Sequence, residues 1–271
     1  MRRLLLVIGV AAVLGAGAPG AAIASGVALP VPANLEPSAA AAAASPIYPV
    51  PAPAAAPASA PPLPACRYTD VQTRYDAFSQ WRKTLLDTIE KVGKRYAPPD
   101  LVSVSRASIP GSGRVRSLVI NALADMARAA RKAGAGIAVR SAYRSYAQQK
   151  AVFASWVQRQ GLKKALLGSA RPGHSEHQLG TTIDFQSAGS STAPWDVKDW
   201  ATTRAGAWMK ANAWKYGFVM SYPKGQRATS CYQYEPWHYR YVGRAEAKAV
   251  HDSGMVLRRY LWETYETAPG A

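Results

Sequence analysis

The sequence predicts an α+β domain in which helices flank a small antiparallel sheet. Two observations support this fold class. Amphipathic helical patterns are concentrated early in the region after residue 66, and several short segments rich in β-branched and aromatic residues follow or separate them. Helices and short strands segregated in this way are typical of α+β domains.

The predicted helices are recognised by apolar residues at a spacing of three to four and by their boundary residues. In the first of them, behind a possible cap at Asp70, the spaced apolar residues are Phe78, Trp81, Leu85 and Ile89. Ser145 is a plausible N-cap of the third, and Gly134 ends the second. The expected helices are 70–95, 115–134, 145–161, 200–217, 244–253 and 254–266.

Four short segments between these helices predict strands at 136–142, 181–187, 218–223 and 237–243. In the second of them, "TTIDFQS", side chains alternate between the two faces of the strand. Ile183 and Phe185 are therefore expected on one face and Asp184 on the other.

Composition divides the chain into an export signal, a linker and one folded domain. Residues 1–24 combine a charged start, an apolar core and the small residues Ala22-Ile23-Ala24, as signal peptides do; an uncleaved membrane anchor is the alternative. Residues 25–65 hold eleven of the chain's 20 prolines among Ala and Ser, which predicts an extended disordered linker. The folded domain is expected to span 66–271.

Cysteine content and charge agree with an exported protein. Cys66 and Cys231 are the only cysteines, so an exported chain predicts a disulfide between them, with two unpaired thiols as the alternative.

The formal net charge is +17. Outside the cytoplasm, anionic wall polymers or a membrane surface are the expected partners and nucleic acid is not; a basic surface that only aids solubility is the alternative.

A possible metal site lies in the stretch "RPGHSEHQLGTTIDF". His177 and Asp184 are seven residues apart, and a turn at Gly180 could bring both side chains to one point. Neutral imidazole and carboxylate suit zinc, although this spacing alone is weak evidence. His238 could be a further ligand, because Pro236 would kink the strand and place Glu235 on the same side.

These residues together would form a hydrolytic zinc centre. Three protein ligands that leave one position open are typical of a catalytic zinc ion, which lowers the pKa of water. Glu235 is the candidate general base. Arg140 and Arg144, at a strand-to-helix junction, are candidates to stabilise an oxyanion, although a single arginine in so basic a chain could equally be a solvated surface residue.

Four segments, "SAYRSYAQQ", "PGHSEHQLGTTIDF", "WKYGFVMSYPKG" and "YEPWHYRYVG", together resemble the VanY-type D-alanyl-D-alanine carboxypeptidases. The resemblance runs from about Tyr96 to Trp262 and implies a hedgehog/DD-peptidase-like fold that binds one zinc ion. It implies the following roles: zinc ligands His177, Asp184 and His238; general base Glu235; oxyanion stabilisation by Arg144; substrate contacts from Ser175 and Gln149; and no ligand role for His174 or Glu176.

The resemblance leads to a functional hypothesis: an exported zinc peptidase, expected to be a monomer, that removes the C-terminal D-alanine of peptidoglycan stem peptides. An L,D-carboxypeptidase or a wall endopeptidase with the same zinc site is the first alternative. A non-catalytic wall-binding module is the second, and its expected signature would be the loss of Glu235 or of a ligand. The sequence retains all of these residues.

Overall fold

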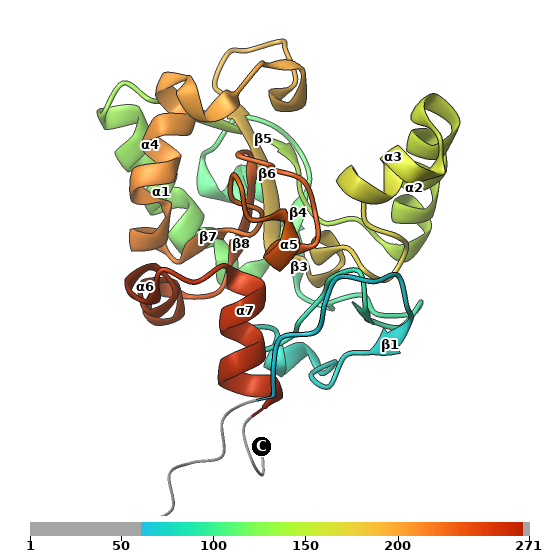
Figure 1. Cartoon of the computed structure of the whole chain (residues 1–271). Helices are drawn as coiled ribbons and strands as arrows, with labels where there is room; N and C mark the ends of the chain where they lie inside the picture. Colours follow the sequence, from blue (N-terminus) through green and yellow to red (C-terminus); the bar gives the residue numbers. More distant parts are fainter. Residues whose placement is uncertain (1–60, 268–271) are drawn as a thin grey trace, which may run out of the picture. The chain divides into compact units, whose positions relative to one another are not determined.

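A four-stranded antiparallel sheet forms the centre of the computed structural model, which describes residues 61–267 (Figure 1). The strand order is β5-β6-β8-β7, and two small two-stranded sheets, β1-β2 and β3-β4, lie outside it. The strands are β1 Val71–Gln72, β2 Glu90–Lys91, β3 Leu101–Ser103, β4 Arg114–Arg116, β5 Ile137–Ser141, β6 Thr182–Ser187, β7 Phe218–Met220 and β8 His238–Tyr241.

Helices surround this sheet, and the α+β prediction is confirmed. The α-helices are α1 Ile120–Lys132, α2 Tyr146–Gln160, α3 Leu162–Gly168, α4 Arg204–Asn212, α5 Arg227–Ser230, α6 Arg244–Ser253 and α7 Leu257–Leu261. The first 24 residues and residues 25–60 of the expected linker lie outside the described part. Within residues 61–267, no helix is both long and apolar enough to cross a bilayer.

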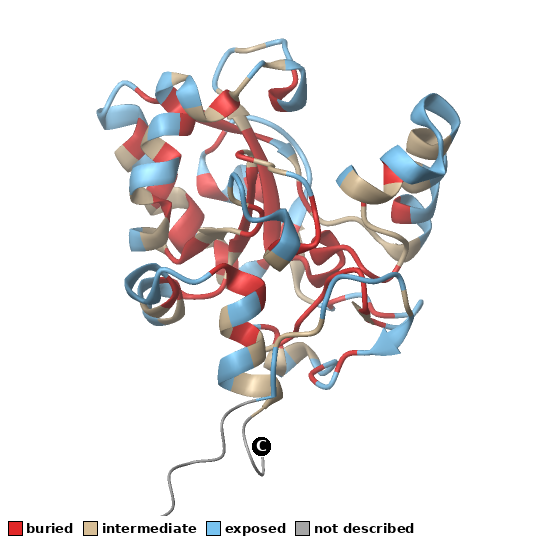
Figure 2. Cartoon of the chain, in the orientation of Figure 1, coloured by how far each residue is buried: buried red, intermediate tan, exposed pale blue. Residues whose placement is uncertain are grey.

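The main hydrophobic core lies between the sheet and helices α1 and α4. Ile183, Phe185 and Tyr239 project from β6 and β8 into this core, where Met126 of α1 and Met209 of α4 are fully buried. Figure 2 shows this buried layer beside the sheet, whereas α2 and α3 stand apart from it with largely exposed surfaces. Because one face of β6 is used for the core, its alternate residues are free to build a polar site on the other face.

Strand register sets the geometry of that polar face. In the antiparallel pair of β6 and β8, Asp184 lies directly opposite His238. On the other side of β6, the pairing with β5 shifts between Val139 and Ser141, and this irregularity places Ser141 opposite Asp184. Side chains from three strands therefore meet at one point of the sheet.

The helix predicted for residues 70–95 is wrong. The segment contains β1, a 3-10 turn Phe78–Gln80 and β2. Trp81, Leu85 and Ile89 are buried as their spacing suggested, but the backbone groups that a helix would pair internally are bound elsewhere. The Asp87 carboxylate accepts hydrogen bonds from the N–H groups of Ile89 and Glu90.

Side chains from distant parts of the chain bind the carbonyls of the same segment. Arg240 donates to the carbonyls of Trp81 and Thr84, each at 2.8 Å. His174 Nδ1 lies 2.9 Å from the Asp87 carbonyl. These tertiary contacts replace the helical hydrogen bonds and outweigh a local pattern that resembled a helix.

The other predicted elements are present, with shorter bounds. Residues 115–119 belong to β4 and a 3-10 turn, so the second helix begins only at Ile120. The predicted helix 200–217 divides into two 3-10 turns around α4, and 254–266 becomes α7 followed by a π-helical turn, Trp262–Glu266. Ser145 caps α2 through a capping box with Gln148, as its position suggested.

The N-terminal end of the domain is attached to its C-terminal part. Cys66 forms a disulfide with Cys231, with Cα atoms 5.3 Å apart. Arg258 of α7 donates to the Pro64 carbonyl at 3.0 Å and pairs with the buried Asp87 carboxylate at 2.5 Å. The last residues of the expected linker therefore already contact the domain.

A close approach of two backbone segments requires glycine at position 206 in α4. A Cβ atom there would lie 2.0 Å from the Trp200 carbonyl oxygen. We expect Gly206→Ala to lower the free energy of unfolding by about 1–3 kcal/mol, because the backbone must shift to relieve the overlap. Urea denaturation measures the change. Gly93→Ala is the control, since no atom lies within 4 Å of its added Cβ; equal stability of the two variants would contradict the prediction.

Candidate active site

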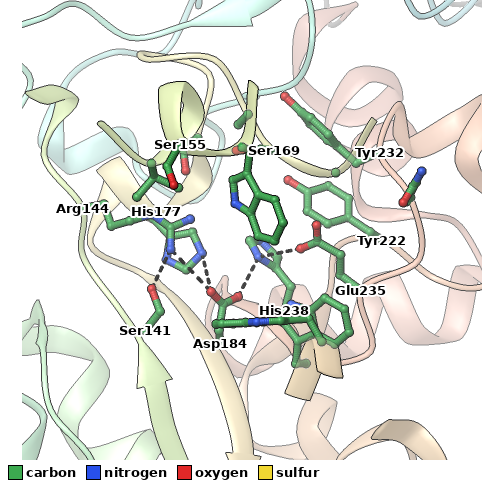
Figure 3. Close-up of a pocket in the computed structure, with 18 of the residues that line it drawn as sticks. Ser141, Arg144, Ser155, Ser169, His177, Asp184, Tyr222, Tyr232, Glu235 and His238 are labelled. Carbon is green, nitrogen blue, oxygen red and sulfur yellow. Dashed lines mark hydrogen bonds and ion pairs between the residues drawn. The ribbon is translucent and has the colours of Figure 1, made fainter. Parts of the chain in front are cut away.

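The polar face of the sheet opens into a cavity of about 700 Å³. Arg144, His177, Asp184, Glu235 and His238 all line it, and Figure 3 shows their side chains pointing toward one another. The remaining walls are formed by helix α2 and the loop after α3 on one side, and by the loops before β8 on the other.

His177, Asp184 and His238 form the one group of three or more potential metal ligands found among the described residues. One ligand atom from each residue can be chosen so that all lie within 4.8 Å of one another. His177 comes from a 3-10 turn, Glu176–Leu179, which ends at Gly180 in a left-handed conformation with φ of 71°. That turn brings the chain back into β6, so the turn predicted from the sequence is confirmed.

Hydrogen bonding leaves His177 ready to bind a metal through Nε2. Its Nδ1 lies 2.7 Å from the Ala142 carbonyl, which can only accept, so Nδ1 carries the proton. The buried Nε2 has no aligned hydrogen-bond partner, although Asp184 Oδ2 is 3.2 Å away. Burial, and then the nearby Arg144 charge, lower the pKa of His177 to about 4, so the ring is neutral near pH 7.

His238 is oriented by a buried glutamate, Glu176, for which the resemblance implied no ligand role. Glu176 Oε2 lies 2.9 Å from His238 Nε2 and also accepts from Ser221 Oγ at 2.6 Å. Its other oxygen accepts from Arg240, which is fully buried, at 3.1 Å. A carboxylate that accepts from one ring nitrogen fixes a metal-binding histidine in tautomer and direction, so that His238 presents Nδ1 to the cavity.

The electrostatics of the site favour a cation at Nδ1 of His238. This atom lies 3.1 Å from Asp184 Oδ1 and 3.5 Å from Glu235 Oε2. Burial acts to lower the pKa of His238, but its hydrogen bonds with Asp184 and Glu176 raise it to about 10. Burial likewise opposes ionisation of Asp184, yet the two histidines hold the pKa of its carboxyl well below the usual range.

These residues fit a zinc ion. Two imidazole nitrogens and one carboxylate are the ligand set of a catalytic zinc site that keeps a position for water or substrate, and a bound cation would take the place of the proton at His238 Nδ1. The unpartnered Nε2 of His177 and the converging Nδ1 of His238 supply the donor atoms.

Glu235 lies beside the ligands because of a turn at Pro236. The His238 N–H donates to the Glu235 carbonyl at 3.1 Å, and this turn places the two side chains on the same side despite their spacing of three. The kink predicted at Pro236 is therefore confirmed. Burial raises the pKa of Glu235 to about 7, so its carboxyl group can both accept and return a proton near neutral pH.

Arg144 enters the cavity from the junction of β5 and α2. Its Nη1 donates to Ser141 Oγ at 2.6 Å and lies 3.5 Å from Asp184 Oδ2. Its Nε donates to Gln149 Oε1 at 2.8 Å, and the Gln149 amide nitrogen in turn donates to the Ala170 carbonyl at 2.7 Å. Gln149 thus orients Arg144. Of the two predicted substrate contacts, Ser175 lines the cavity and Gln149 does not.

His174 lies outside the group of potential ligands, in agreement with the prediction, and its ring anchors the loop. Its Nδ1 lies near the carbonyls of Asp87 and Glu90, and its Nε2 is 3.0 Å from Asp70. The ring joins the loop that carries His177 to the segment before residue 91. Burial, and then the Arg171 charge, lower its pKa, whereas its hydrogen bonds to Asp70 and the Asp87 carbonyl act in the opposite direction.

Glu90, next to this anchor, makes stability depend on pH. Burial, and then the charges of Asp87 and Glu266, raise its pKa from 4.5 to about 7. The stability contributed by protonated Glu90 is fully present below pH 4.5 and is lost as the pH rises through 7. We expect Glu90→Gln to raise the melting temperature at pH 8 by about 2–4 °C relative to the parent, and much less at pH 4.5. Differential scanning fluorimetry measures the melting temperatures. Glu263→Gln, on the C-terminal turn, is the control. An equal effect of Glu90→Gln at both pH values would contradict the raised pKa of Glu90.

Several residues of the site were not predicted from the sequence. Arg240 and Ser221 donate to Glu176, which orients His238. Ser141 accepts from Arg144, and Tyr222 packs its ring 4.6 Å from that of His238. Arg240 could have been suspected, because it lies two positions after His238 in a strand and so shares its face. The others depend on loop geometry.

Comparison with known proteins identifies relatives of this architecture. The family model described as "VanY: D-alanyl-D-alanine carboxypeptidase" matches residues 112–244. YodJ of Bacillus subtilis, named as a carboxypeptidase, is 37% identical over 181 residues, 63% of this chain and 65% of YodJ. A D-alanyl-D-alanine carboxypeptidase of Enterococcus faecium is 33% identical over 123 residues, which cover 45% of this chain and 35% of the relative. The chain thus spans less than two thirds of these curated relatives.

Solved structures match the fold. The LD-carboxypeptidase LdcB superposes with a TM-score of 0.59 at 35% identity, covering 68% of this chain and 85% of LdcB. A variant of the vancomycin-resistance D,D-pentapeptidase VanY, in complex with Zn(II), superposes with a TM-score of 0.57 at 27% identity, covering 67% of this chain and 99% of VanY.

Proposed function

The chain belongs to the VanY D-alanyl-D-alanine carboxypeptidase family, and from this premise we propose that it removes the C-terminal D-alanine of peptidoglycan stem peptides. The observation that carries the proposal is the arrangement of one cavity. Glu235 and Arg144 lie on either side of the group formed by His177, Asp184 and His238. A base, a cation for the oxyanion and a metal-binding group are the parts that amide hydrolysis requires.

His177, Asp184 and His238 would hold the zinc ion. When bound, zinc supplies a Lewis acid that polarises the substrate carbonyl and lowers the pKa of water. Glu235 takes the proton of the attacking water and passes it to the leaving amine of D-alanine. Arg144, held by Ser141 and Gln149, donates hydrogen bonds to the oxygen that gains negative charge.

A second specificity uses the same residues. LdcB, which is 35% identical, is an LD-carboxypeptidase, so cleavage between an L-configured residue and a terminal D-alanine is the main alternative. The two activities differ in the stereocentre before the scissile bond. The residues that act on the scissile amide would serve both, so the part of the cavity that contacts the residue before the scissile bond would distinguish the two substrates.

The experiment is digestion of purified muropeptides by the zinc-loaded protein, with products weighed by mass spectrometry. Loss of one alanine from pentapeptides ending in D-Ala-D-Ala supports the proposal. Loss of alanine only from tetrapeptides supports the LD alternative, and cleavage of cross-links supports an endopeptidase. Activity that persists without zinc after chelation would contradict the metal-dependent mechanism.

We further propose that the protein acts outside the cytoplasm. The Cys66–Cys231 disulfide supports this proposal, because such bonds persist in oxidising compartments. The basic surface would favour contact with anionic wall polymers or a membrane surface. Fractionation of cells that express the full chain, followed by immunoblotting, tests the location.

A further inference from the structure

Helix α2 forms one wall of the cavity over much of its length. The residues that line the cavity from this helix recur at helical spacing and so lie on one face: Ala151, Val152, Ser155, Trp156, Arg159 and Gln160. Arg144, at the beginning of the same helix, reaches the metal-binding group. The cavity therefore extends from the reaction centre along α2 toward its C-terminal end.

Arg159 is the one charged cavity-lining residue outside the central group. The other ionic groups of the lining are Arg144, Asp184 and Glu235, together with the two histidines. Among residues 61–267, no carboxylate is recorded in an ion pair with Arg159. Its guanidinium instead lies over the ring of Trp156, 5.4 Å from the centroid, and Trp156 also lines the cavity.

The surroundings of Arg159 provide no intramolecular anion from its own part of the chain. Between Asp125 and Glu176 the sequence contains ten Lys and Arg residues but not one Asp or Glu. Helices α2 and α3 both lie in this interval. An arginine held against an aromatic ring keeps its fork of N–H donors available, and such a fork binds the carboxylates that peptides carry in bidentate fashion.

We propose that Arg159 is a specificity-determining residue that binds a carboxylate on the substrate, on the amino side of the scissile bond. The proposal rests on the proposed function, because a carboxypeptidase releases one terminal residue and the rest of its peptide must extend away from the reaction centre, which the part of the cavity along α2 allows. The inference therefore assigns a preference for stem peptides that carry a free acidic group over those in which this group is a carboxamide.

The length of α2 limits where that carboxylate can be. Arg159 lies ten residues after Gln149, which contacts Arg144, and ten residues of α-helix rise about 15 Å. An extended peptide covers about 3.3–3.6 Å per residue. Allowing for the reach of both side chains, the carboxylate should lie roughly two to four residues before the scissile bond. The carboxylate of the released D-alanine is too close to the reaction centre to reach Arg159.

The test compares pairs of synthetic peptides ending in D-Ala-D-Ala that differ only by Glu or Gln at one of these upstream positions. For the parent protein, we expect kcat/KM to be about three- to fivefold higher for the best-placed Glu peptide, with the difference in KM, as for a partly exposed ion pair. In the Arg159→Gln variant, the ratio of kcat/KM for the Glu peptide to kcat/KM for the Gln peptide should fall to about one. The Arg159→Lys variant should retain part of this preference. Lys163→Gln, an exposed residue of α3 that does not line the cavity, should keep the parental ratio.

Each outcome bears on one claim. An unchanged Glu-to-Gln ratio in Arg159→Gln, or an equal loss in Lys163→Gln, would overturn the inference while leaving the hydrolytic function intact. Weaker turnover of both peptides by the same factor in Arg159→Gln would point to the terminal carboxylate and also overturn it. Absence of alanine release from every peptide by the parent would count against the proposed function. In that case the ratio of the Kd values for the Glu and Gln peptides of each pair is measured by tryptophan fluorescence in the parent and in Arg159→Gln. A ratio that changes between the two proteins shows that Arg159 recognises the carboxylate, and an unchanged ratio shows that it does not.

Discussion

Glu235→Gln is expected to lower kcat for D-alanine release by about 10³-fold, the middle of the range for loss of a general base. Glutamine keeps the size and the hydrogen-bonding shape of the side chain but cannot accept a proton from water. The carboxylate lies 3.5 Å from His238 Nδ1, at the edge of the metal-binding group, so its loss removes the proton acceptor while the three ligands remain. Steady-state kinetics with a D-Ala-D-Ala peptide measure the effect.

Two controls separate a catalytic defect from a damaged site. The zinc content of Glu235→Gln, measured by plasma mass spectrometry, should match that of the parent, because Glu235 is not among the grouped ligands. Its melting temperature should not fall, because a neutral side chain replaces a carboxyl group whose ionised form burial disfavours. A variant with full zinc content and more than a tenth of the parental kcat would contradict the assignment of Glu235 as the base.

The sequence was most informative where function and local structure depend on the same few residues. His177 and Asp184 are separated by a glycine turn and half a strand, a distance over which local rules predict the geometry. The cross-strand pairing of Asp184 with His238 adds the third ligand. The sequence cannot show that pairing alone, and the resemblance to a known family supplied it.

The wrong helix at 70–95 shows the limit of local reasoning. The apolar spacing in that segment correctly indicated burial of Trp81 and Leu85. A spacing of three or four does not, however, distinguish a helix from an irregular segment that tertiary hydrogen bonds hold in place. The decisive contacts come from Arg240, more than 150 residues away, which binds two of the segment's carbonyls. No window of sequence around residue 80 contains that information.

Arg240 is therefore where the fold and the site are coupled. Its side chain is fully buried and donates to Glu176 Oε1, to the Trp81 carbonyl and to the Thr84 carbonyl. Burial opposes ionisation of Glu176, but its hydrogen bond with His238 and the Arg240 charge lower its pKa to about 2. His238 and the Arg240 guanidinium together keep the carboxylate charged, and that carboxylate orients the metal-binding ring.

We expect Arg240→Met to lower the free energy of unfolding by about 3–5 kcal/mol, because it leaves a buried carboxylate without its cation and two buried carbonyls without donors. Zinc affinity should fall by about 10- to 100-fold, the usual cost of losing support behind a ligand. Urea denaturation and competition with a zinc chelator measure the two effects. Arg240→Lys should lose less stability, because it keeps the charge.

The matched control is Arg244→Met, four residues later. Arg244 pairs with Asp125 at 2.7 Å, but the two side chains are 56% and 40% exposed. Exposed pairs contribute at most about 1 kcal/mol, so this variant should remain close to the parent in stability and zinc affinity. If Arg240→Met and Arg244→Met lost equal stability, or if Arg240→Met bound zinc as tightly as the parent, Glu176 would orient His238 without help from Arg240. The buried arginine would then serve only to hold the segment at Trp81 and Thr84 against the sheet.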